Sequence, residues 1–322
     1  MPSPNLSEIV TTTMRNRSKK LADNVTKNNS LLLRLQERGN QKPFSGGTNI
    51  TQELEYAENS TYKRYSGYET LNISPSDVAT AAEFDIKQIA VAVSISGLEQ
   101  LKNAGKEKLI DLLESRIKNA ERTFANNMSI DIYSDGTADS GKQIGGLQLL
   151  VADTPESGTV GGINRATHTF WRNQEYDFSD NSATPGISTI QTAMNQLYLK
   201  CARGTDRPDL IVADNVYFRY YWESLQSIQR VTNDKLAAAG YDNLKFMGAD
   251  VVFDGGQGGA CPANRMYFLN TNYIYLRPHK DRNMVPLDPD RFAVNQDAMV
   301  KLIGWAGNMT ASNCSLQGII QP

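Results

Sequence analysis

The stretch "GKEKLIDLLESRIKNAERTFANNMS" (Gly105 to Ser129) decides the fold, because it carries the clearest helical pattern in this 322-residue chain. Its apolar residues recur every three or four positions, which places them along one stripe of a helix, and the charged opposite side is expected to face water. At ~1.5 Å per residue the helix would be about 35 Å long, enough to support a sheet along its length. The stripe consists of Leu109, Leu113, Ile117, Ala120, Phe124 and Met128.

The chain in front of this helix reads as a long, half-polar hairpin. Strand-like alternation occurs first at Ile50, Leu54 and Tyr56, and again in "AEFDIKQIAVAVSIS" (residues 82–96). An isolated two-stranded hairpin is marginal in water, so this one must lie on something else. Between the two strands lie aromatic and apolar residues interleaved with charges: Tyr62, Lys63, Arg64, Tyr65, Tyr68, Glu69, Leu71 and Ile73.

The first 42 residues form a basic arm. They carry eight basic and three acidic side chains, a net charge of +5, whereas the whole chain carries −2 and the remainder therefore −7. A basic leader on an acidic body suggests an arm with its own function. The arm's stretch "NNSLLLRLQERG" can be helical and stops at Gly39. The N-terminus lacks the apolar core of a signal peptide and no apolar run approaches the ~20 residues that span a bilayer, so we expect a soluble cytosolic product.

The second half of the chain reads as a mixed α/β unit followed by strands. "GLQLLVAD" (146–153) and "RPDLIVADN" (207–215) are expected to be buried strands, and Asp214 or Asn215 to cap the helix that follows. "TPGISTIQTAMNQLYLKCARG" (184–204) is expected to be a helix. The closing stretch is extended, and we expect Gly304 and Gly307 to mark β-bulges.

The sequence offers no convincing catalytic or metal-binding constellation. His168 and His279 lie outside any HExxH or HxH pattern, so we expect surface or hydrogen-bonded roles. The loop "GGQGGACPA" (255–263) lacks the ending and the flanking elements of a phosphate-binding loop. We therefore predict no enzyme, no cofactor and no metal. The acidic pairs that could hold a cation do not match the EF-hand pattern and fit solvated loops better: Asp131 with Asp135, and Asp288 with Asp290.

The cysteines also give no sign of a metal site or a disulfide. Cys201, Cys261 and Cys314 are odd in number and widely spaced, with no CxxC motif. We expect free thiols.

Several stretches together carry a resemblance to a known family. They are "RYSGYETLNISPSDVATAAEFDIKQIAVAVSISG" (64–97), "ESRIKNAERTFANN" (114–127), "GKQIGGLQLLVADTPESGTVGGINRATHTFWRNQ" (141–174), "RPDLIVADNVYFRYYWESLQ" (207–226), "MYFLNTNYIYLRP" (266–278) and "NQDAMVKLIGWAGNMTASNCSLQGII" (295–320). With the order of elements, they make the chain resemble the major capsid protein of tailed bacteriophages, which has the Hong Kong 97 fold. The likeness covers nearly the whole chain.

The resemblance implies an α+β capsid fold with four parts. Residues 1–50 would be the N-terminal arm and 51–83 the extended E-loop. Residues 84–146 with 270–310 would form the P-domain, with its long spine helix at about 106–128. Residues 147–269 with 311–322 would form the A-domain, whose tip would meet its copies around five- and six-fold axes.

The resemblance also implies partners and a location. Pentamers and hexamers of this chain would close an icosahedral shell around double-stranded DNA, touched non-specifically, with a portal protein at one vertex and decoration proteins where present. The chain would lie in the virion head after assembly in the host bacterial cytoplasm, with no membrane partner. It lacks the long helical scaffolding segment of some relatives, so we expect a separate scaffolding protein or none.

The E-loop tip supplies the expected contacts between copies: Tyr62, Lys63, Arg64, Tyr65 and Tyr68. Some relatives cross-link an E-loop lysine to a neighbour's asparagine; Lys63 is the only lysine in this tip, and no partner can be identified. Arm and hairpin have too little apolar surface to offset ordering costs of ~1–2 kcal/mol per residue. We therefore expect their apolar side chains, from Leu31 to Leu71, to gain burial only against other copies.

Two other functions compete with the capsid hypothesis. A nanocompartment shell protein of the encapsulin type shares the fold but encloses enzymes, and genomic neighbours would discriminate. An α/β enzyme using residues 147–269 would need a convergent polar pocket and a titratable group with a shifted pKa. For the capsid hypothesis we expect Tyr65→Asp to weaken assembly more than Lys301→Asp does.

Overall fold

The computed structural model describes residues 29–98, 106–225, 244–255, 259–292 and 298–322. The helices are α2 (Ser30–Glu37), α4 (Lys106–Asp131), α5 (Ala138–Gly141), α6 (Leu147–Leu150), α7 (Ile190–Cys201), α8 (Asn215–Ser224), and the 3-10 turns η1 (Thr169–Trp171) and η2 (Thr271–Tyr273). The strands are β1 (Asn49–Glu55), β2 (Ala79–Asp85), β3 (Lys87–Ser96), β4 (Thr159–Val160), β5 (Ile163–Asn164), β6 (Gln174–Asp177), β7 (Leu210–Ala213), β8 (Leu244–Phe246), β9 (Ala249–Phe253), β10 (Met266–Leu269), β11 (Ile274–Pro278), β12 (Val285–Phe292), β13 (Ala298–Ala311) and β14 (Gly318–Gln321).

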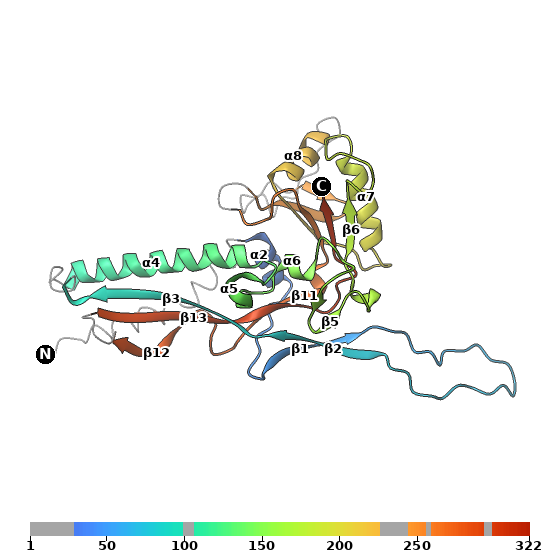
Figure 1. Cartoon of the computed structure of the whole chain (residues 1–322), viewed down its shortest axis with the longest axis horizontal. Coiled ribbons are helices and arrows are strands. Elements are labelled where there is room, and N and C mark those ends of the chain that lie inside the picture. Colours follow the sequence, from blue (N-terminus) through green and yellow to red (C-terminus); the bar gives the residue numbers. More distant parts are fainter. Residues whose placement is uncertain (1–28, 99–105, 226–243, 256–258, 293–297) are drawn as a thin grey trace.

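The long helix is present and lies along a sheet, as predicted. Helix α4 has 26 residues, or about 39 Å at ~1.5 Å per residue. It runs beside β3 and β13 (Figure 1), which pair antiparallel from Ala298 opposite Ser96 to Gly307 opposite Lys87. β11 and β12 pair with the other side of β13. The expected stripe is buried where its side chains are described, at Ile117, Ala120, Phe124 and Met128, while Leu109 and Leu113 lie outside the described side chains.

A second, six-stranded sheet has the order β6-β14-β10-β7-β9-β8. Its β7 residues alternate between two hydrophobic cores, because successive side chains on a strand point to opposite faces. Ile211 packs with the residues of α7 and α8. Leu210 and Val212 belong to the larger cluster that contains the buried residues of α4. The predicted strand at Leu210 is confirmed, and so is the cap of α8, since the Asp214 side chain accepts from the Tyr217 amide.

Two sequence predictions about local structure are wrong. The stretch from Leu147 forms the short helix α6 rather than a strand, and Leu147 and Leu150 are both buried at a spacing that fits a helical turn. The backbone at Gly146 passes so close to the end of α4 that an added Cβ would lie 2.6 Å from the Asp131 carbonyl oxygen. A side chain would therefore not fit at position 146, and the helix α6 begins at the next residue.

The glycines of β13 are not bulges. Pairing with β3 runs without interruption past Gly304 and Gly307. A Cβ at Gly304 would lie 2.8 Å from the Leu287 side chain, and one at Gly307 would lie 2.8 Å from the Trp305 ring. Glycine is required at position 307, where the Arg277 backbone also approaches closely, and a side chain at position 304 would displace that of Leu287. The register shift in this sheet falls between Leu287 and Arg291 of β12 instead.

Candidate assembly surface

A two-stranded hairpin, β1 with β2, projects from the body of the subunit (Figure 1). Its strands pair antiparallel from Asn49 opposite Asp85 to Glu55 opposite Ala79. One face is apolar and anchored in the main core. That face consists of Ile50, Leu54, Ala82 and Phe84, none of them more than 4% exposed. The predicted hairpin is confirmed for β1 and β2, whose buried face packs in the main core. The rest of the expected second strand, residues 87–96, forms β3 instead and pairs with β13.

The tip of the hairpin extends beyond the paired strands without any sheet structure of its own. The last backbone hydrogen bond across the hairpin runs from the Tyr56 amide to the Val78 carbonyl oxygen, 3.0 Å away. Beyond it the apolar side chains face water. They are Tyr62 (80% exposed), Tyr65 (63%), Tyr68 (fully exposed), Leu71 (44%) and Ile73 (92%). Five large apolar side chains exposed within twelve residues form a patch of the kind that marks an interaction site.

The charged residues of the tip interact only locally. The Lys63 ammonium lies 2.9 Å from a Glu69 carboxylate oxygen, and both side chains are almost half exposed. A surface ion pair of this kind contributes ~0–1 kcal/mol, so it leaves the loop free to adapt. The five residues predicted as contacts, Tyr62, Lys63, Arg64, Tyr65 and Tyr68, therefore lie together in one exposed loop. That they contact a neighbouring copy stays a prediction.

Replacing Tyr65 with aspartate is expected to weaken association between copies at least tenfold without changing the stability of the subunit. The ring is 63% exposed and has little to lose within its own subunit. Lys301 is not a suitable control, because it is buried to 3% exposure and its replacement would disturb the fold. Lys142→Asp is the better control, since Lys142 is exposed. Light scattering of both variants checks the prediction, and equal effects would contradict it.

The arm helix α2 corrects an expectation from the sequence. Leu31, Leu32 and Leu35 are at most 1% exposed and belong to the main core of their own subunit. These leucines are therefore buried without a contact from another copy. The residues after α2 extend the edge of the β11–β13–β12 sheet beside β11, where the Lys42 amide donates to the Leu276 carbonyl oxygen and the Phe44 amide to that of Pro278.

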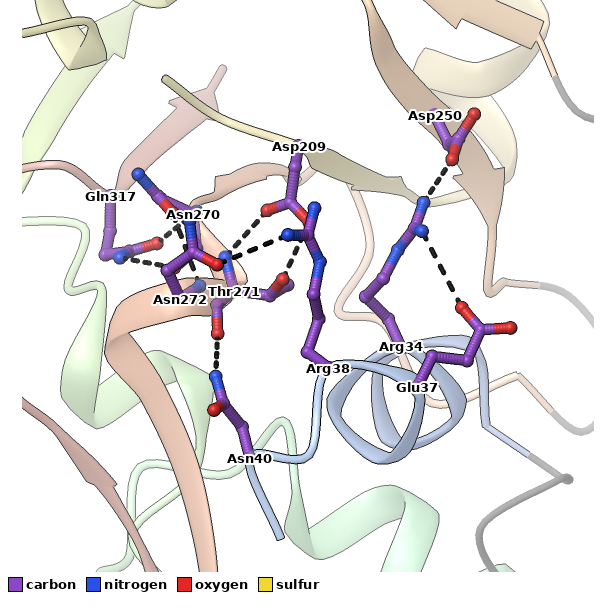
Figure 2. A network of polar contacts seen from close by, with 10 residues as sticks. All are labelled: Arg34, Glu37, Arg38, Asn40, Asp209, Asp250, Asn270, Thr271, Asn272 and Gln317. Carbon is purple, nitrogen blue, oxygen red and sulfur yellow. Dashed lines mark hydrogen bonds and ion pairs between the residues drawn. The ribbon is translucent and has the colours of Figure 1, made fainter. Parts of the chain in front are cut away.

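Figure 2 shows how polar contacts hold this arm in place. Arg34 pairs with Asp250 of β9, and Arg38 lies 3.1 Å from Asp209, just before β7. The Asn40 side chain donates to the Thr271 carbonyl oxygen at 2.5 Å. Sequence reasoning missed this network, because the partners are separated by more than 170 residues along the chain.

The N-cap of α2 contacts a partly buried carboxylate. The Asn29 side chain caps the helix through the Leu31 and Leu32 amides and also donates to an Asp254 oxygen at 3.1 Å. The Tyr133 hydroxyl donates to the same oxygen. Burial raises the pKa of the Asp254 carboxyl above its ordinary value, although both hydrogen bonds act in the opposite direction. The arm, the end of α4 and the end of β9 therefore meet at one titratable group.

Asp254→Asn is expected to flatten the pH dependence of folding stability. Because the folded-state pKa is raised, the folded state binds this proton more tightly than the unfolded state does. The resulting stability is full below the ordinary pKa of 3.8 and is lost as pH rises toward the folded pKa. The asparagine oxygen can accept the same bonds without ionising. Between pH 4 and pH 8, the free energy of unfolding measured in urea should fall less for the variant than for the natural chain. Equal falls for the two proteins would contradict the assignment.

The histidines and cysteines considered in the sequence have ordinary structural surroundings. The His279 Nδ1 accepts from the Asp281 amide at 3.1 Å, and His168 packs its ring against Phe170. Among the described residues no group of three or more potential metal ligands occurs, and no helix is long and apolar enough to cross a bilayer. Burial raises the pKa of all three thiols, which are free as predicted: Cys201, Cys261 and Cys314.

No family model and no curated protein sequence matches this chain. Solved structures do match. A cyanophage A-1(L) capsid asymmetric unit aligns over 88% of this chain and 90% of its own, with a TM-score of 0.59 at 18% identity. The capsid of Myoviridae phage XM1 aligns over 89% and 91%, with a TM-score of 0.52 at 10% identity. The holo-SrpI encapsulin complex from Synechococcus elongatus PCC 7942 aligns over 89% and 86%, with a TM-score of 0.56 at 8% identity.

These alignments define the class of fold. All three alignments span 86–91% of each chain. By their descriptions two of the matched structures are phage capsids and the third is an encapsulin complex. The chain has the α+β Hong Kong 97 fold of tailed-phage capsid proteins, as its sequence predicted.

Proposed function

We propose that this chain is a major capsid protein that assembles as pentamers and hexamers into the icosahedral head around a phage double-stranded DNA genome. The observation that carries the proposal is the chain-wide match to a cyanophage capsid subunit. The exposed tyrosines of the hairpin tip support it, since they offer apolar surface that only another molecule can cover. Head-to-tail contacts that close on a rotation axis generate rings from one kind of subunit.

The proposed domain boundaries follow the two larger sheets. Residues 1–50 are the arm and 51–83 the E-loop. Residues 84–146 with 270–310 form the P-domain around α4, and 147–269 with 311–322 form the A-domain around the six-stranded sheet. The division is supported by the pairing of strands, because β3, β11, β12 and β13 form one sheet and β6, β7, β8, β9, β10 and β14 form the second.

The proposed partners are other copies of this chain first. The further proposed partners are a portal protein at one vertex, a separate scaffolding protein or none, and decoration proteins where present. Packaged DNA is touched non-specifically, and there is no membrane partner. The location is the virion head, after assembly in the bacterial cytoplasm. Tyr62, Lys63, Arg64, Tyr65 and Tyr68 are the proposed contact residues of the E-loop.

One alternative has a specific observation in its favour. The match to the holo-SrpI encapsulin complex has a TM-score of 0.56, close to that of the cyanophage capsid. A nanocompartment shell would enclose protein cargo rather than a genome. The contents of particles isolated from producing cells decide between the two: DNA supports the capsid, and an enclosed enzyme supports the compartment. No observation favours the α/β enzyme.

Electron microscopy of the purified protein tests the shell function common to both. We expect closed particles of uniform diameter, or rings of five or six copies. A subunit that stays monomeric at high concentration would overturn the proposal.

A further inference from the structure

The β1–β2 hairpin is held by a loop that belongs to the six-stranded sheet. Residues 152–173 lead from the end of α6 to the start of β6 and include β4, β5 and η1. The base of this loop is closed, because the Asn173 side chain accepts from the Ala152 amide at 3.1 Å and donates to the Ala152 carbonyl oxygen at 2.9 Å. The loop is therefore anchored beside β6, an edge strand of that sheet (Figure 1).

Buried side chains hold this loop in one conformation. Arg165 is 1% exposed, and its guanidinium donates to the Leu150 carbonyl oxygen at 2.5 Å. Trp171 is equally buried, and its ring nitrogen donates to the Val160 carbonyl oxygen at 3.0 Å. Buried hydrogen bonds are costly to break when the separated groups would stay unpaired. The loop thus offers a fixed surface to the hairpin.

The loop contacts the hairpin at two points. The Glu83 amide of β2 donates to the Gly161 carbonyl oxygen at 2.9 Å. A Cβ at Gly161, whose φ is +57°, would lie 2.8 Å from the Ala82 Cβ, so the loop backbone lies directly against β2. Farther along the hairpin, the Phe170 and Tyr56 rings stack with their centroids 5.1 Å apart and their planes at 26°.

The bonds between the hairpin and the other large sheet lie nearer its base. The Asn308 side chain of β13 donates to the Asp85 carbonyl oxygen at 2.8 Å, at the last residue of β2. The Arg277 side chain of β11 donates to the Gln52 side chain at 3.2 Å, within β1. These bonds can act as a pivot. The stack on Tyr56 lies beyond them, so it can set the angle at which the hairpin leaves the subunit.

This angle matters because the exposed tip begins at Tyr56. From Tyr56 to Gly67 the chain can extend up to ~36 Å at ~3.3 Å per residue. Over that length, a rotation of about 10° at the root would displace the end of the tip by ~6 Å, which is enough to separate two side chains in contact.

We propose that the loop of residues 152–173 sets the direction of the hairpin, with Phe170 as a positioning residue for the contacts of the tip. The inference rests on the proposed assembly of this chain, because it concerns how the tip reaches another copy. Phe170 acts through Tyr56 of its own subunit and does not itself have to touch the neighbouring copy.

Distances between spin labels in the dilute, monomeric full-length protein test the positioning role without any shell. The labels are attached to cysteines that replace Glu55 at the end of β1, Gln196 of α7 and Asn126 of α4, all of them exposed. The native cysteines are buried and should not react. In Phe170→Ala, the distributions of both distances from position 55 should become about twofold broader, because the attraction between the rings is lost. The distance between positions 126 and 196 should stay unchanged, which would show that the body of the subunit remains folded.

Three further variants separate positioning from a general loss of packing. Phe170→Tyr keeps the stacked ring and should retain the narrow distributions. Thr167→Ala is the matched control, because Thr167 is exposed in the same loop, and it should also leave them narrow. Gly161→Ala should shift the mean distances from position 55, because the added methyl group would press on Ala82. Equal widths for Phe170→Ala and Thr167→Ala would overturn the proposal.

Electron microscopy of the same variants tests the consequence for assembly. Phe170→Ala should give about tenfold fewer closed particles than Thr167→Ala, because a misdirected tip weakens every contact in the shell at once. Phe170→Tyr should restore the yield, and equal yields for Phe170→Ala and Thr167→Ala would overturn the role in assembly. If even the natural chain forms no particles or rings, the proposed function fails, whereas the distance measurements still decide whether the loop sets the direction of the hairpin.

Discussion

A variant without the hairpin tip is expected to fold normally and to form no shells. The deletion should remove residues 58–76, because the bond from the Tyr56 amide to Val78 closes the paired part of the hairpin. The buried face of β1 and β2 then stays intact. A two-residue Asn-Gly turn can join the shortened strands.

The expected effect is large because the tip carries much of the exposed apolar surface. A buried tyrosine removes ~150–250 Å² from water, at ~25 cal/mol per Å². Covering Tyr62, Tyr65 and Tyr68 could therefore contribute on the order of 10 kcal/mol to each contact, before the entropic costs of association. Every copy in a ring would lose this contribution at once.

Circular dichroism melting and electron microscopy together check the deletion. We expect an unchanged melting temperature and at least a hundredfold fewer particles than the full-length chain gives under the same conditions. A length-matched control replaces residues 58–76 with a Gly/Ser segment of equal length. It keeps the length of the loop but removes its side chains. Normal particles from the deletion would refute the role given to the E-loop.

The sequence could predict those parts of the fold in which a regular hydrophobic period can be buried against only one kind of neighbouring element. The stripe through Ile117 and Phe124 specifies a helix that lies on a sheet, because its period leaves no other way to bury it. The alternation in β3 specifies a strand for the same reason. The exposed tip was also predictable, since its tyrosines are interleaved with charges and no helix or strand period collects them on one face.

The parts that could not be predicted depend on partners distant in sequence. Leu147 and Leu150 fit a strand or a helical turn, and the close passage at Gly146 decides for the turn. Gly304 looks like a bulge in isolation, but the Leu287 side chain fills the space where its Cβ would lie. The leucines of the arm gave no sign of which molecule would cover them, because Asp209 and Asp250, which position the arm, follow it by more than 170 residues.

Leu32→Ala in the arm is expected to lower the free energy of unfolding by ~2–5 kcal/mol. Leu32 is 1% exposed and packs in the main core, so its loss leaves a cavity between α2 and the body of the subunit. Leu199→Ala is the matched control, because Leu199 also lies on a helix but is 68% exposed. Its effect should stay within ~0.5 kcal/mol.

Urea unfolding of the isolated subunit distinguishes two views of the arm. If α2 belongs to the subunit core, Leu32→Ala destabilises the monomer and Leu199→Ala does not. If the arm gained its burial only from a neighbouring copy, as composition alone suggested, both substitutions would leave the monomer unchanged and Leu32→Ala would act only on assembly. The contacts of Arg34, Arg38 and Asn40 with the body of the same subunit favour the first result. On that view helix α2 is already folded before assembly begins, and the exposed tip of the hairpin is the part of the described chain that we propose assembly covers.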